Sequence, residues 1–190
     1  MLNNLRDRLS PALERLGRSF ASTGLSPNFW TAIGLVLAIM AAISYGIAPE
    51  YALVIGGVLL LASGFFDMID GQVARVTGKT SKKGGYLDSM SDKIAEVAIF
   101  LGILAGGHAE PYLVFLGITL SLLVSYARAK SDALNIKLQG VGIGERAERL
   151  LVIAIIGMIG FMEPAIVIVI LIAGATLLQR MVVTCRNIKE

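Results

Sequence analysis

Four aspartates, one arginine and several small residues interrupt an otherwise apolar chain between positions 67 and 92. The stretch reads Asp67-x2-Asp70-Gly71-x2-Ala74-Arg75-x8-Gly84-x3-Asp88-x3-Asp92. Ionisable residues at membrane depth are costly and mark functional sites. Carboxylate oxygens with no histidine or thiolate beside them favour Mg²⁺, Mn²⁺ or Ca²⁺ over Zn²⁺. The spacing therefore predicts a metal site.

The spacing also predicts what else shares the site. Residues 67, 70, 71, 74 and 75 follow the i, i+3, i+4, i+7, i+8 pattern of one helical face, and residues 88 and 92 share a face of the next helix. The two small residues leave room for a ligand, and the planar guanidinium suits a phosphate. Mg²⁺ commonly binds through carboxylates together with substrate phosphates. The set therefore favours a diphosphate held by two ions, with a fourth carboxylate free to take a proton from a hydroxyl.

Composition places these residues in a membrane protein. The chain has 190 residues, of which 55% are hydrophobic and only 16% are charged, and its mean hydropathy is +0.74. A soluble domain would carry about 25% charged residues. We therefore expect residues 1–190 to form a single polytopic membrane domain, with membrane lipids as partners and no nucleic acid.

A spanning helix needs about 20 mostly apolar residues. Six segments qualify, so we expect an all-α integral membrane protein with six transmembrane helices, at 28–47, 51–75, 86–107, 111–134, 145–162 and 164–184. The fifth and sixth are separated only by a turn at Glu163-Pro164. The second and third reach bilayer length only if they include the aspartates, which places the acids just below one membrane surface.

The basic residues predict which surface that is. All 17 Lys and Arg fall on one side of the six-helix arrangement, whereas the three opposite turns contain Glu50, His108, Glu110 and Glu163. Cytoplasmic loops carry the Lys/Arg excess, so we expect an integral cell-membrane protein with cytoplasmic termini and a cytoplasmic active site. Residues 1–25 are expected to form an amphipathic arm in the membrane interface, because apolar residues recur there every three or four positions: Leu2, Leu5, Leu9, Leu13, Leu16 and Phe20.

Other interpretations of these patterns stay open on the residues alone. The aspartates could pair with Arg75, Lys79 and Lys93 in a solvated cluster, or line a cation or proton path in a transporter. The glycines of Gly102-x3-Gly106 could serve packing within one chain or a dimer interface.

The run from Asp67 to Asp92 resembles the signature of the CDP-alcohol phosphotransferases at every position. The resemblance implies an enzyme that binds a CDP-lipid donor, CDP-diacylglycerol or CDP-archaeol, in a cytoplasm-facing cavity. A second alcohol attacks the phosphorus nearer the lipid, and CMP leaves. The six spans and the interfacial arm resemble that family as well, which also implies a homodimer.

The resemblance assigns roles to the motif positions. Asp67, Asp70 and Asp88 would bind Mg²⁺ or Mn²⁺, as two ions. Asp92 would be the catalytic base and would also touch the second metal. The CDP-binding set would comprise Asp70, Gly71, Ala74, Arg75 and Gly84.

Two basic segments bear on which alcohol is the acceptor. The runs 125–130 (Ser-Tyr-Ala-Arg-Ala-Lys) and 142–149 (Gly-Ile-Gly-Glu-Arg-Ala-Glu-Arg) resemble the inositol-phosphate branch of the family. This resemblance implies inositol 1-phosphate, a phosphorylated polyol, as acceptor, with Arg128, Arg146 and Arg180 at its phosphate. Glycerol 3-phosphate is the alternative acceptor. The basic residues could also be ordinary cytoplasmic anchors, and the glutamates of 142–149 could simply form surface pairs with the arginines.

Overall fold

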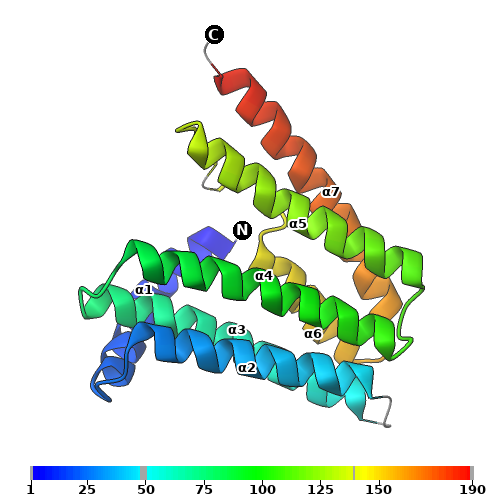
Figure 1. Ribbon diagram of the computed structural model, residues 1–190, viewed down its shortest axis with the longest axis horizontal. Coiled ribbons are helices and arrows are strands. Elements are labelled where there is room, and N and C mark those ends of the chain that lie inside the picture. Colours follow the sequence, from blue (N-terminus) through cyan, green and yellow to red (C-terminus); the bar gives the residue numbers. More distant parts are fainter. Residues whose placement is uncertain (1, 48–50, 139, 189–190) are drawn as a thin grey trace.

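The structure is a computed structural model that describes residues 2–47, 51–138 and 140–188 (Figure 1). Within these ranges it is all-helical, with seven helices and no strand. Their bounds are α1 Leu2–Ala21, α2 Pro27–Gly46, α3 Ala52–Val76, α4 Lys82–Ala105, α5 Pro111–Ala133, α6 Arg146–Met158 and α7 Met162–Asn187.

The two helices that carry the aspartates are continuous. Helix α3 runs for 25 residues without a break through Asp67 and Asp70, as its length had predicted. Helix α4 begins at Lys82, four residues before the predicted start, because Ser81 caps it: the Ser81 hydroxyl accepts a hydrogen bond from the Gly84 amide at 3.0 Å. The first turn of α4 therefore lies close after the end of α3.

Helix α2 packs against both α3 and α4, and the long pair α5 and α7 crosses these helices at an angle, with α6 adjoining α3 and α7 (Figure 1). Helices α4 and α5 meet at the 106–110 turn and diverge toward their other ends (Figure 1). A Cβ at Gly102 would overlap the Ala42 backbone, and one at Gly106 would overlap the Tyr45 carbonyl. The Gly102-x3-Gly106 pair therefore allows close packing of α4 on α2 within one chain.

The fifth predicted span is shorter than expected. Helix α6 covers 13 residues and ends at Met158, whereas the prediction extended to 162. Glu163 and Pro164 do not form the turn; they lie in the first turn of α7, where a proline is tolerated, and the turn is at 159–161. At 1.5 Å per residue α6 is about 20 Å long, less than a bilayer's hydrocarbon core.

Four of the described helices are long and apolar enough to cross a membrane: α2, α3, α5 and α7. Helix α6 is too short for this, and α4 carries Asp88, Asp92, Lys93 and Glu96 within its length. Of the turns predicted opposite the basic residues, 106–110 and the α6–α7 connection are present. Glu50 lies outside the described residues.

The N-terminal arm is helical and ends in a turn at Gly24, whose φ of +76° suits a residue without a side chain. Its second half packs on the bundle: Leu13 is buried, and the Phe20 ring lies edge-on to Trp30 of α2, with centroids 4.9 Å apart. Leu16 is exposed. The predicted apolar face at Leu2, Leu5 and Leu9 lies outside the described part of the structure, which covers only the backbone there.

Candidate metal centre

Three of the four aspartates converge where α3 faces the start of α4. Asp67, Asp70 and Asp88 each present a carboxylate oxygen within 4.8 Å of the others. Asp70 is buried, and its two partners are half-buried. The donors are all hard oxygens, with no histidine or cysteine among them, so the set fits Mg²⁺ or Mn²⁺.

Helix α2 contributes a residue that the sequence analysis missed. The Thr31 hydroxyl donates a hydrogen bond to Asp70 Oδ2 at 2.6 Å. This contact fixes one carboxylate oxygen of Asp70 and directs the carboxylate, as partners behind metal ligands commonly do. A threonine in an apolar helix gives no sequence signal of such a role, because the contact joins residues 39 positions apart.

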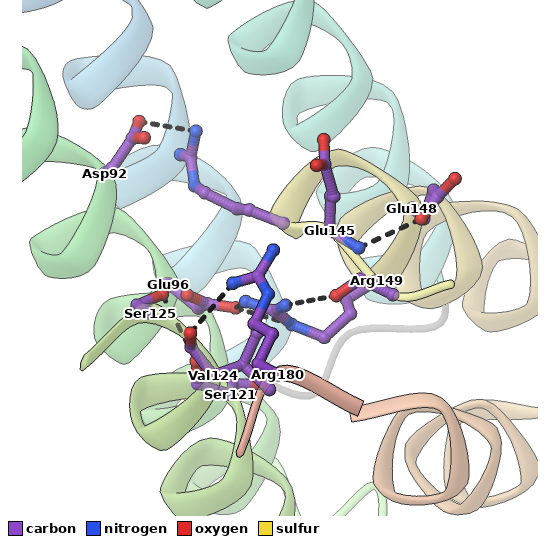
Figure 2. Close-up of polar contacts among 11 residues, drawn as sticks. Asp92, Glu96, Ser121, Val124, Ser125, Glu145, Glu148, Arg149 and Arg180 are labelled. Atoms are coloured by element: carbon purple, nitrogen blue, oxygen red, sulfur yellow. Dashed lines mark hydrogen bonds and ion pairs between the residues drawn. The ribbon is translucent and has the colours of Figure 1, made fainter. Parts of the chain in front are cut away.

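The fourth aspartate has a different partner. Asp92 lies outside the three-carboxylate cluster and forms an ion pair with Arg146, whose Nη1 is 2.5 Å from Asp92 Oδ1 (Figure 2). The same nitrogen lies 3.3 Å from Asp67 Oδ1. Arg146 therefore bridges the cluster and the predicted base. In the described part of the chain, the alternative partners Arg75, Lys79 and Lys93 make no ion pair with the aspartates.

One donor of Arg146 has no partner within the described part of the chain. Its Nε is buried and has no hydrogen-bond partner among the described residues. The side chain lines a small polar cavity whose walls come from α2, α3, α4 and α6: Thr31, Gly34, Leu35, Ser63, Asp67, Ser91, Asp92, Ala95 and Arg146. A buried donor without a partner is costly. The cavity has a volume of about 10 Å³, room for about one water molecule, and its lining includes the carboxylates of Asp67 and Asp92, so the Nε of Arg146 is a donor beside a small polar space.

The run 142–149 positions Arg146 through local structure. Glu145 caps α6, and its amide donates to Glu148 Oε2 at 2.9 Å in a reciprocal capping box (Figure 2). The two glutamates are thus used for capping and not for the surface pairs with arginines considered above. Arg146 is the first helical residue, and Arg149, one turn on, is buried against Glu96 of α4.

Of the predicted CDP-binding positions, Gly71, Ala74 and Arg75 lie on α3 after the buried Asp70, and Gly84 lies in the first turn of α4. A Cβ at Gly71 would meet only the Arg75 guanidinium, at 3.7 Å, and the Arg75 side chain is exposed. Ala74 is half-buried on the same face. Gly84 approaches α2, since its Cβ would come within 3.4 Å of Asn28 Oδ1. Gly71 therefore leaves space on the helix that carries Asp67 and Asp70, whereas Gly84 allows the start of α4 to approach α2 closely.

Lys130 and Arg149 are the second choices for the acceptor phosphate in the sequence prediction. Arg149 is excluded because Glu96 and the Gly144 carbonyl use all its nitrogens.

The predicted acceptor arginines other than Arg146 differ from each other. Arg128 is exposed near the end of α5. Arg180 of α7 is buried, and its Nη1 donates to the Val124 carbonyl at 2.8 Å (Figure 2). Its Nε donates to the Val141 carbonyl at 3.1 Å. Arg180 thereby joins α7 to α5 and to the loop before α6, which leaves one guanidinium nitrogen for a ligand.

This chain resembles known proteins of one class of enzyme. Residues 25–185 match the family model of CDP-alcohol phosphatidyltransferase. The chain is 33% identical to an archaetidylinositol phosphate synthase of Pyrococcus horikoshii, over 95% of this chain and 94% of that protein. It is also 33% identical to one of Methanothermobacter thermautotrophicus, over 100% and 96%. A crystal structure of Mycobacterium tuberculosis phosphatidylinositol phosphate synthase with CDP-DAG bound aligns with a TM-score of 0.74 and 26% identity, over 90% of this chain and 92% of that one.

The Thr31 contact predicts a measurable change in metal binding. Replacing Thr31 with Val keeps the side-chain shape but removes the donor to Asp70, so we expect the Mn²⁺ affinity of the purified protein to fall about tenfold. Titration calorimetry measures it. The control is Thr119→Val, which removes an exposed hydroxyl bonded only within α5. Equal Mn²⁺ affinity in Thr31→Val and wild type would contradict the role given to Thr31.

Proposed function

We propose that this chain, which belongs to the CDP-alcohol phosphatidyltransferase family, transfers the phosphatidyl or archaetidyl group of a CDP-lipid to a hydroxyl of inositol 1-phosphate and releases CMP. The relatives that match over nearly the whole chain are named for this class of product. Their names are those of synthases, which favours an enzyme over the cation or proton transporter that the acidic cluster alone left open.

One observation carries the choice of a phosphorylated acceptor. A guanidinium lies between the cluster and the predicted base, with a buried Nε that has no partner in the described residues. If Arg146 binds the acceptor's phosphate, a hydroxyl of the same molecule can reach Asp92, which is 2.5 Å from Arg146. An acceptor without a phosphate would leave this buried Nε without a partner. Arg128 and the remaining nitrogen of Arg180 complete the proposed phosphate set.

The proposed donor site lies at the three-carboxylate cluster and the small residues next to it. Asp67, Asp70 and Asp88 would hold Mg²⁺ or Mn²⁺, as two ions, with Asp92 beside the second. The related M. tuberculosis enzyme has been crystallised with manganese and citrate. When bound, the ions would neutralise the diphosphate and polarise the phosphorus that is attacked. Gly71, Ala74 and Gly84 would leave room for the CDP moiety, and Arg75 would bind its phosphate oxygens.

The residues of the chain itself would transfer a proton and orient the acceptor. Asp92 accepts the proton of the acceptor hydroxyl as its oxygen bonds to the phosphorus nearer the lipid. The bond from that phosphorus to the bridging oxygen breaks, and CMP leaves with the bonding electrons. Arg146 orients the acceptor, since a hydroxyl held near its target reacts faster.

The membrane arrangement is part of the proposal. We propose a single domain, 1–190, in which all six helices α2 to α7 cross or enter the bilayer, with α6 embedded between longer neighbours. The arm 1–25 would lie in the cytoplasmic interface, where Leu16 meets lipid. Both termini and the aspartates would face the cytoplasm, and the family resemblance favours a homodimer.

An acceptor panel tests the reaction directly. Purified protein with Mg²⁺ or Mn²⁺ and either CDP-diacylglycerol or CDP-archaeol is offered inositol 1-phosphate, inositol, glycerol 3-phosphate or serine, and CMP release is measured. We expect inositol 1-phosphate to give a kcat/KM at least about a hundredfold above free inositol, because Arg146 would otherwise lack its phosphate partner. A preference for glycerol 3-phosphate would make that compound the acceptor in place of inositol 1-phosphate. If none of the four acceptors gave CMP release, the proposal would be contradicted.

The lone cysteine tests the topology. Cys185 is exposed near the end of α7, so we expect a membrane-impermeant maleimide to label it in inverted vesicles and not in right-side-out vesicles. The matched control is Glu110→Cys in a Cys185→Ser background, which places the thiol on the opposite turn and should reverse the pattern. Labelling of Cys185 from the outside would refute cytoplasmic termini.

A further inference from the structure

A fully buried ion pair lies directly behind the cavity. Arg149 of α6 donates to Glu96 Oε1 of α4 from Nη2 at 2.7 Å and from Nε at 3.1 Å (Figure 2). Its third nitrogen, Nη1, donates to the Gly144 carbonyl at 2.7 Å. The two side chains are 1% and 0% exposed. Arg149 is therefore fully engaged within the protein and has no nitrogen free for substrate.

The pair repeats, one turn deeper, the contact at the cavity. Asp92 and Glu96 are four residues apart on α4, and Arg146 and Arg149 are three apart on α6, so each pair shares a helix face. The outer ion pair, Asp92–Arg146, borders the cavity, with side chains 22% and 16% exposed. The inner pair, Glu96–Arg149, is sealed from it. Two carboxylates of α4 thus face two guanidinium groups of α6.

Stability alone does not account for the inner pair. A buried ion pair is often no more stabilising than apolar residues of the same volume. What the pair adds is geometry: Arg149 fixes α6 to α4 through Glu96 and fixes the loop residue that precedes the Glu145 cap. These contacts determine where the first residue of α6 lies, and that residue is Arg146.

We propose that Glu96 and Arg149 are positioning residues, which hold the start of α6 so that Arg146 lies beside Asp92 and binds the acceptor's phosphate at the distance that the transfer requires. The inference rests on the acceptor role proposed above for Arg146. Glu96 itself touches no substrate, because it is fully buried, and its Oε2 has no partner in the described residues.

The test replaces the inner pair by an apolar pair. Glu96→Leu combined with Arg149→Met removes both charges together, so it avoids leaving one buried charge unpaired. We expect it to fold, with a Tm close to wild type and an unchanged KM for CDP-lipid. The KM for inositol 1-phosphate should rise about tenfold or more, because a small displacement of a binding group is costly. The control is Ser121→Ala, which changes a fully buried polar residue of α5 whose hydroxyl has no hydrogen-bond partner in the described residues.

A double-mutant cycle with Arg146→Ala separates positioning from a general structural effect. If the inner pair acts through Arg146, replacing it in the Arg146→Ala background should leave the acceptor KM at the value of Arg146→Ala alone. Multiplying effects, an equal rise in both KM values, or a normal acceptor KM in the folded apolar variant would each overturn the inference. If the apolar variant does not fold, Glu96→Gln is judged by the same criteria.

The cycle also separates a failure of this inference from a failure of the acceptor role proposed for Arg146. An unchanged acceptor KM in Arg146→Ala alone would refute the acceptor role of Arg146, and the positioning role with it. A raised acceptor KM in Arg146→Ala, together with no effect of the inner pair, would refute the positioning role only.

Discussion

Carboxylates crowded between apolar helices stay ionised only beside compensating positive charge, and this constraint organises the structure. Asp67, Asp70 and Asp88 converge from two helices, which makes a cluster of hard donors suited to a divalent ion. Arg146 supplies fixed positive charge next to it and contacts Asp67 and Asp92 with one nitrogen. The site therefore contains three acids suited to a metal ion, a fourth acid next to Asp67, and one guanidinium that contacts both Asp67 and Asp92.

The surrounding helices serve this arrangement in different ways. Close packing of α2 on α4 at Gly102 and the Thr31 contact make α2, α3 and α4 one unit that fixes the acids. Helix α6 brings Arg146 to them from its first turn, where a capping box begins the helix. Helices α5 and α7 diverge from α4 (Figure 1), and Arg180 joins them to the loop before α6. In the proposed function, the CDP-lipid and the acceptor both bind next to this charged centre.

The sequence predicted what depends on local spacing. Helical periodicity placed Asp67 and Asp70 on one face, and apolar length required α3 to continue through them; both hold in the structure. Prediction from the sequence failed where contacts between distant segments determine the structure. Thr31 has no signature apart from its contact with Asp70. Hydropathy extended the fifth helix to 162, although α6 ends at Met158. Arg146 and Arg149 look alike in the sequence, but only the fold shows that one borders the cavity and the other is sealed against Glu96.

The central claim is a division of labour among the four acids, with three binding metal and Asp92 moving the proton. Comparing Asp92→Asn with Asp70→Asn tests it most directly, by measuring CMP release and the Kd for CDP-lipid in the presence of Mg²⁺. Asp92→Asn should lower kcat at least about a hundredfold and leave the Kd for CDP-lipid nearly unchanged, whereas Asp70→Asn should weaken donor binding. Normal turnover in Asp92→Asn, or loss of donor binding together with turnover, would contradict the account.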